Sequence, residues 1–186
     1  AVGIALTTGF LLVGPFLAIG LYELSRQRER GERVRLAPSL VAWKANSPAI
    51  GFYALALTLL LAVWIRVSVV VVAIAFPAGR IDWTSPDTWV FAAAYAVAGG
   101  ALALFVFATS SLSLPLLLER RDMDTISAAI VSFSALRTNF RPMLAWAACI
   151  VALSAAGFAA YYVGLVVVLP LIGHMTWHAY RESVAP

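Results

Sequence analysis

Residues 50–76 read IGFYALALTLLLAVWIRVSVVVVAIAF, a run of apolar side chains interrupted by one charged residue, Arg66. A helix rises 1.5 Å per residue, so about 20 apolar residues cross the hydrocarbon core of a bilayer. This run is long enough for one crossing with residues to spare. The run therefore indicates that the chain is embedded in a lipid bilayer.

Three more uncharged apolar stretches occupy residues 1–22, 89–118 and 142–180. The last one is too long for a single crossing, so we divide it near Gly157–Gly164 into two. The sequence predicts an all-α integral membrane protein forming one polytopic domain, residues 1–186. Its five expected transmembrane helices are 1–22, 50–76, 89–118, 142–160 and 162–180. Because an apolar stretch begins at Ala1 without a preceding Met, we also expect a sixth helix upstream.

Basic residues predict the orientation. With alternating spans, eleven of the 13 Lys and Arg residues fall on one side, and only Arg80 falls on the other. Cytoplasmic loops of membrane proteins carry such an excess. We expect a multi-pass protein of the bacterial inner membrane with a cytoplasmic C-terminus. The net charge of +4 fits anionic lipid, and no nucleic-acid partner is expected.

Two segments of the chain share one order of features, which predicts a parallel repeat of residues 9–76 and 109–160. In each, a Pro-containing helix ends in a carboxylate beside arginines, and a short amphipathic segment precedes the next span. The second amphipathic segment is the clearer one. Asp124 or Thr125 can cap it, and Ile126, Ile130, Phe133, Leu136 and Phe140 recur at helical spacing. We expect both amphipathic segments to form helices at the cytoplasmic interface, the second packed on the span ends or serving as a lipid sensor.

Arg66 is the most costly residue of the chain, because a cation at the bilayer centre costs ~2.5–3.5 kcal/mol. It can extend toward outer headgroups or pair with Asp82 or Asp87 of the outer loop. The functional alternatives are an ion pair with a partner subunit or a site for an anionic ligand or lipid, with Trp64 beside it. Ala92, Ala96 and Gly100 form a stripe of small residues suited to close helix contact. We treat these five positions as candidate partner or lipid contacts.

His174 and His178 lie four residues apart and so on one helical face. Two imidazoles at this spacing can share a metal or bind haem iron, yet they form an incomplete site. Both can equally anchor the helix at the inner interface together with Trp177. They are weak metal candidates, and the sequence predicts no cofactor.

Pro15, Pro115 and Pro170 occupy the three helices that descend toward the cytoplasm, and Ser111 lies near Pro115. Each proline frees a backbone carbonyl one turn earlier. In transporters such broken helices form the substrate site, whereas elsewhere they only pack. Phosphate loops, paired nucleophiles and bases, and zinc-protease motifs are missing from the sequence. An enzyme is therefore not expected, and no catalytic residue is assigned.

Three stretches of the chain resemble a family of predicted bacterial integral membrane proteins of unknown function. They are GFLLVGPFLAIGLYELSR (9–26), SLPLLLERRDMDTISAAIVSFSALRTNFRPMLAW (113–146) and GLVVVLPLIGHMTWHAYR (164–181). Members of that family usually carry another helix upstream, and some are labelled as cytochrome c oxidase components. The resemblance marks five residues as a unit, a candidate cytoplasmic docking surface: His174, Trp177, His178, Tyr180 and Arg181.

Three functions remain open. The first is a non-catalytic accessory or assembly subunit of a larger inner-membrane complex, respiratory or otherwise energy-transducing, with lipids and other membrane subunits as partners. The second is a small transporter or channel built on Pro15, Ser111, Pro115 and Pro170. The third is a haem- or metal-binding membrane protein acting through His174 and His178.

Overall fold

A computed structural model describes the backbone of residues 2–184 and the side chains of residues 16–184. Within residues 2–184 every regular element is helical and none is a strand. The elements in chain order are α1 (Val2–Glu29), α2 (Leu36–Leu40), the 3₁₀ helix η1 (Ala42–Asn46), α3 (Ser47–Ala75), α4 (Pro86–Ser110), α5 (Ser113–Glu119), α6 (Thr125–Thr138), α7 (Phe140–Ala159) and α8 (Leu165–Ser183).

Three segments of the described chain are long and apolar enough to cross a membrane. They are Ala42–Ala75, which contains α3, then Pro86–Glu119, which contains α4 and α5, and Phe140–Ala159, which is α7. The prediction of an all-α membrane protein is thus confirmed. Five crossings stay a prediction, as does the repeat of residues 9–76 and 109–160.

The long apolar stretch 142–180 turns back on itself between α7 and α8. Residues 160–164 make the turn, and Tyr161 and Tyr162 adopt positive φ angles of 52° and 66°. Two glycines allow the close approach, because a Cβ on Gly157 would stand 2.5 Å from Leu165 Cδ2 and one on Gly164 would stand 3.0 Å from Gly157 Cα. The turn therefore lies within residues 157–164, where the sequence analysis divided the stretch.

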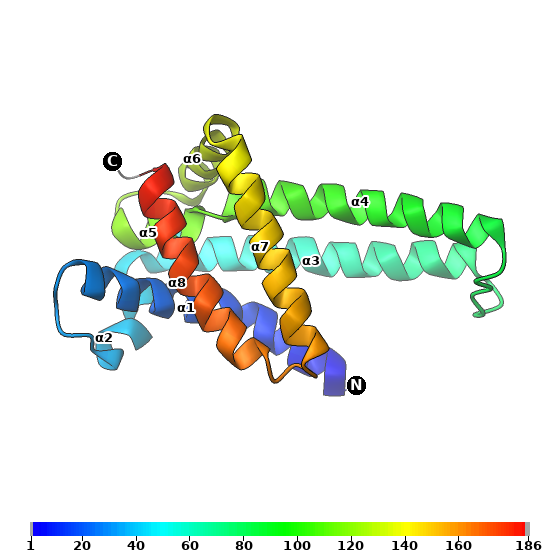
Figure 1. Cartoon of the computed structure of the whole chain (residues 1–186), viewed down its shortest axis with the longest axis horizontal. Helices are drawn as coiled ribbons and strands as arrows, with labels where there is room; N and C mark the ends of the chain where they lie inside the picture. Colours follow the sequence, from blue (N-terminus) through cyan, green and yellow to red (C-terminus); the bar gives the residue numbers. More distant parts are fainter. Residues whose placement is uncertain (1, 185–186) are drawn as a thin grey trace.

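The molecule consists of two groups of helices that meet at one end (Figure 1). One group packs α8 against α1 and α7. The other is the α3–α4 hairpin, whose two helices run side by side away from the rest of the chain (Figure 1). We call residues 55–107 the α3–α4 arm, and we call the end that carries residues 26–44 and 119–141 the basic end.

Most of the buried core lies at the basic end, where α5 contacts α1, α3, α6 and α8. Leu112, Leu116, Leu117 and Leu118 are fully buried there. The other large members of this core come from five elements: Ile19 and Tyr22 of α1, Ile50 and Tyr53 of α3, Leu136 of α6, Met143 of α7, and Trp177 and Tyr180 of α8. The core at the basic end of the molecule therefore joins nearly all of the helices.

The third predicted span, 89–118, is broken at Ser111 and Leu112 between α4 and α5. Pro115 has no backbone N–H, so the carbonyl of Ser111 loses its partner one turn later. Hydroxyl groups satisfy the neighbouring backbone groups. Ser132 of α6 donates to Ala108 O at 3.0 Å and accepts from Leu112 N at 3.3 Å, and Ser113 donates to Thr109 O at 2.6 Å.

Helix α6 is capped by Asp124, whose carboxylate accepts from the backbone N–H groups of Ile126 and Ser127, both at 2.9 Å. Its buried face consists of small or polar residues and one leucine: Ala128, Ser132, Ala135 and Leu136. The other members of the predicted apolar stripe are exposed, namely Ile126, Ile130, Phe133 and Phe140. The helix therefore packs on α4 and α5 through its small face and turns its large apolar side chains outward.

Candidate functional site

Trp64 holds the two helices of the α3–α4 arm together. Its ring lies 5.5 Å from the ring of Tyr95 and 3.2 Å from where a Cβ on Gly99 would stand. Tyr95 also donates a hydrogen bond to Ser68 Oγ at 2.7 Å. Sequence reasoning placed Trp64 among the partner contacts, whereas these contacts are internal to the arm.

Arg66 lies on the opposite side of α3 from Trp64, because two residues along a helix correspond to a rotation of about 200°. Its side chain is exposed. The ion pairs among the described residues join Arg26 to Glu23 and Arg181 to Glu29 and Glu119, and none includes Arg66. Asp82, one suggested partner, accepts instead from Thr84 N at 2.9 Å and from the Thr84 hydroxyl.

The three residues of the small-residue stripe of α4 differ in their exposure. Ala96 and Gly100 are exposed, Ala92 is half-buried, and no atom lies within 4 Å of a Cβ placed on Gly100. The neighbouring Gly99, which the sequence analysis did not single out, is the glycine that contacts α3. Among the residues whose side chains are described, none covers Ala96 or Gly100, so another helix can approach α4 there.

At the basic end, the last two turns of α8 tie α1 to α5. Arg181 Nε donates to Glu29 Oε1 at 2.8 Å, and its Nη1 donates to Glu119 Oε1 at 3.2 Å. Trp177 Nε1 donates to the other oxygen of Glu29 at 2.9 Å, and the Tyr180 hydroxyl donates to the other oxygen of Glu119. We call these five residues the clamp.

The clamp changes how the predicted docking surface is described. Trp177 and Tyr180 are each 1% exposed, so their side chains serve contacts inside the chain. Only His178 is fully exposed, with Arg181 and His174 half-buried. Docking at this unit stays a prediction that now depends on His178 and Arg181.

The clamp also lowers the pKa of one carboxyl group. Trp177 donates a hydrogen bond to the ionised form of Glu29, and Arg181 adds a second hydrogen bond and its charge, so the pKa of Glu29 lies below its ordinary value. Sequence reasoning noticed that Glu119 ends a helix beside arginines but did not find Glu29. The only signal for it was its place one helical turn after Arg26 in a run of charges.

His174 and His178 both line a cleft between α1 and α8, together with residues of the α1 end. Ser25 of α1 is hydrogen-bonded to His174 Nδ1 at 2.6 Å. Among the described residues, no group of three or more His, Cys, Asp or Glu side chains is placed to hold a metal ion. The two imidazoles therefore stand as a pair, which weakens the metal hypothesis.

Among the described side chains, those of Ser111, Pro115 and Pro170 do not come together in one site. Pro115 is fully buried in the core, and Ser111 lies 3.4 Å from the hydroxyl of Ser132. Pro170 lies inside α8 on a different group of helices. Pro15 lies outside the residues whose side chains are described. The hydroxyls of Thr109 and Ser113 bind backbone carbonyls and that of Ser111 binds the Ser132 hydroxyl, which favours packing as the role of this break.

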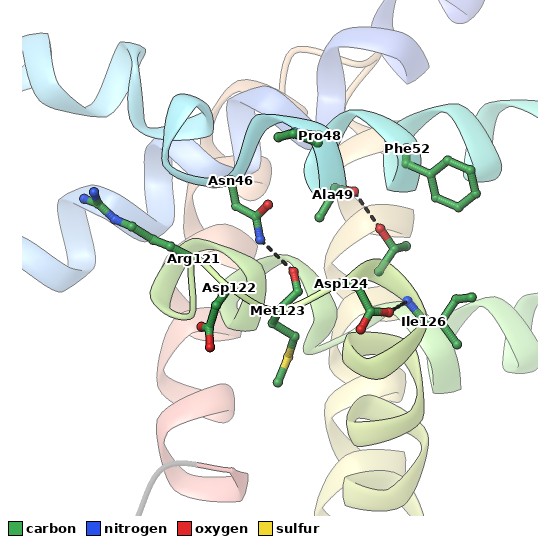
Figure 2. Close-up of a pocket in the computed structure, with 10 residues that line it drawn as sticks. Asn46, Pro48, Ala49, Phe52, Arg121, Asp122, Met123, Asp124 and Ile126 are labelled. Carbon is green, nitrogen blue, oxygen red and sulfur yellow. Dashed lines mark hydrogen bonds between the residues drawn. The ribbon is translucent and has the colours of Figure 1, made fainter.

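Figure 2 shows how the two long connections of the basic end are joined. Asn46 Nδ2 donates to Met123 O at 2.8 Å, and the Thr125 hydroxyl donates to Ala49 O at 2.8 Å. These contacts place the N-terminal ends of α3 and α6 side by side, around a cavity of about 420 Å³. Asn46 belongs to the predicted repeat, but its partner lies 77 residues away and no local pattern indicates it.

A family model described as "Predicted integral membrane protein (DUF2189)" matches residues 3–119. The chain belongs to this family. The match covers α1 to α5, which include the α3–α4 arm and most of the basic-end core. No match was found among curated proteins or among solved structures. The family assignment establishes a predicted integral membrane protein and carries no catalytic residues.

Proposed function

We propose that this chain is a non-catalytic accessory or assembly subunit, which binds another integral membrane subunit through its α3–α4 arm. The carrying observation is the arm itself. In both of its spans the most apolar 18-residue window has no residue buried inside the chain. A helix pair that buries so few of its residues inside the chain leaves its surface available to bind another membrane subunit.

Arg66 supports a protein partner over lipid alone. A charged side chain within a membrane span almost always faces protein or a water-filled cavity and pairs with another group. The described residues supply no such pair for Arg66. A carboxylate in a span of the partner would neutralise the guanidinium.

The stripe of Ala96 and Gly100 supports the same conclusion from the second helix of the arm. Without a hydrophobic driving force between helices in lipid, close backbone approach through small residues is a main source of association. Both residues are exposed. A partner helix can therefore approach α4 closely at this place.

The excess of basic residues at one end supports an inner-membrane location with the basic end and the C-terminus in the cytoplasm. A respiratory or otherwise energy-transducing complex is the class that the family resemblance implies. The partner is a subunit with a membrane-embedded Asp or Glu.

The test is site-specific photo-crosslinking in native membranes, with a photoreactive residue at position 70, 96 or 161. Val70 is 57% exposed and lies one helical turn from Arg66 on the same side of α3, so a crosslinker there leaves Arg66 in place. Position 161 is the matched control, because Tyr161 is 89% exposed in the α7–α8 turn, outside the arm. We expect positions 70 and 96 to give the same defined adduct and position 161 to give none. Mass spectrometry of the adduct identifies the partner and the crosslinked span.

Two variants sharpen this experiment. Arg66→Ala should weaken recovery of the complex by about 30-fold or more, since losing one partner of a buried charge pair costs 2–5 kcal/mol. Arg66→Lys should restore part of it, and Arg80→Ala in the outer loop should change nothing. A protein that stays monomeric or homodimeric in mild detergent, without adducts to another chain, would overturn the proposal.

A further inference from the structure

A cleft of about 600 Å³ opens between the end of α1 and the second half of α8. Its polar lining is Ser25, Arg28 and Glu29 from α1 and His174 and His178 from α8. Leu24 and Val34 give it an apolar side. Both histidines of the chain thus face a single concave surface.

Ser25 fixes the ring of His174. The serine has one proton, and its oxygen lies 2.6 Å from His174 Nδ1 but 3.2 Å from Leu21 O. When this proton is donated to Nδ1, the neutral imidazole carries its own proton on Nε2. When the ring is protonated, Nε2 again carries a proton. In both states this ring offers a hydrogen-bond donor to a ligand.

The charges around the cleft favour an anion. Arg28 supplies a guanidinium that suits phosphate oxygens, and its side chain is exposed. Glu29 also lines the cleft, but its two oxygens already accept hydrogen bonds from Trp177 and Arg181. The negative charge of Glu29 is therefore already neutralised by Arg181. The remaining ionisable groups of the cleft, which are the Arg28 guanidinium and the two imidazoles, favour an anionic ligand.

The position of the cleft indicates the source of the anion. It lies where the apolar part of α1 ends and the basic residues 26–35 begin, which is where the proposed orientation places the cytoplasmic headgroups. Basic pockets between helices on this side of a membrane bind anionic lipid headgroups. We propose that the cleft binds the phosphate of an anionic phospholipid, with Arg28, His174 and His178 on the headgroup and Leu24 and Val34 along the start of the acyl chain.

The experiment uses the full chain in a neutral detergent and follows the imidazole NMR signals of its two histidines during titration with phosphatidylglycerol. His178→Gln assigns the two rings. We expect both rings to shift saturably with phosphatidylglycerol and to remain unchanged with phosphatidylcholine. Arg28→Gln should raise the apparent Kd about fivefold, the effect of one basic residue near an anionic lipid.

Arg33→Gln is the matched control, since Arg33 is an exposed arginine five residues further along, in the connection after α1, that does not line the cleft. Its effect should stay below about twofold. Equal weakening by both arginine variants, or equal shifts with both lipids, would overturn the proposal. A saturable shift with inorganic phosphate at the affinity of the lipid would also overturn it, because the site would then take a soluble anion.

Discussion

The basic-end core and the α3–α4 arm both contain runs of large apolar side chains, yet these side chains are buried in the core and exposed in the arm. In α5 the run Leu114–Leu118 is entirely buried, and α5 contacts five other α-helices and η1. In the arm, Val63, Val70 and Val97 are mostly exposed. Because lipid solvates an apolar side chain as well as a neighbouring leucine does, apolar character alone does not decide burial in this protein. Polar contacts at helix ends and small residues at crossings decide it.

The largest expected effect tests the core side of this contrast. Trp177→Ala removes a side chain that is 1% exposed and leaves Glu29 without the indole donor. We expect it to lower the free energy of unfolding by about 3–5 kcal/mol. The measurement is denaturant unfolding in one detergent at fixed protein concentration.

Trp83→Ala is the matched control for Trp177→Ala. Trp83 is 57% exposed in the α3–α4 connection, so its loss should change the free energy of unfolding by less than about 0.5 kcal/mol. Similar losses for the two tryptophans would mean that the arm contributes to the fold as much as the core does.

A smaller loss is expected where α6 supports the break between α4 and α5. Ser132→Ala leaves Ala108 O and Leu112 N without their hydroxyl partner in a fully buried place. An unsatisfied buried group costs about 1–3 kcal/mol. Ser134→Ala, on the exposed face of the same helix, should have almost no effect. If the two variants unfold alike in the same denaturant titration, the break does not depend on this hydroxyl.

The third prediction concerns pH and the clamp. Since the pKa of Glu29 is lowered in the folded protein, its contribution is fully present above its unfolded pKa of about 4.3. It is lost as the pH falls through the folded value. Unfolding measured from pH 3 to pH 7 should show a shallower acid loss in Glu29→Gln than in the parent protein.

Glu32→Gln controls for the general effect of removing a carboxylate near the end of α1. Glu32 is exposed and takes no part in the clamp. An acid loss that is equally steep in the parent protein and in Glu29→Gln would show that the contacts from Trp177 and Arg181 do not stabilise the ionised form.

Features of the fold that depend on neighbouring residues could be predicted from the sequence, and contacts between residues far apart in the chain could not. Apolar runs and charge gaps predicted helices close to their observed bounds, as residues 50–76 and Ser47–Ala75 show. Asp124 or Thr125 was predicted as the cap of the second amphipathic segment, and Asp124 caps α6, because capping is local chemistry. Contacts between distant residues had no such signal. Glu29 and Arg181 are 152 positions apart, and only the packing of α1 along α8 brings them together.

The candidate site shows the same division. Arg66 was recognised because an ionisable residue in a span is unusual in any fold. Which of Gly99 and Gly100 contacts α3 and which is exposed could not be predicted, since adjacent small residues look alike in sequence. Only the rotation of α4 places Gly99 under Trp64 and leaves Gly100 exposed.

The smallest expected effect on the fold is the sharpest test of the arm. Arg66→Leu in the isolated chain should change the free energy of unfolding by less than about 0.5 kcal/mol, because the side chain is exposed and packs on nothing that the fold requires. The same substitution should abolish the adduct at position 96, because the partner carboxylate would then lie unpaired in lipid. A loss above about 1 kcal/mol in the isolated chain would mean that Arg66 has a role within the fold, and the arm could no longer be treated as a separate binding element. Stability and binding would then depend on one residue, whereas the proposed function requires that Arg66 affects binding alone.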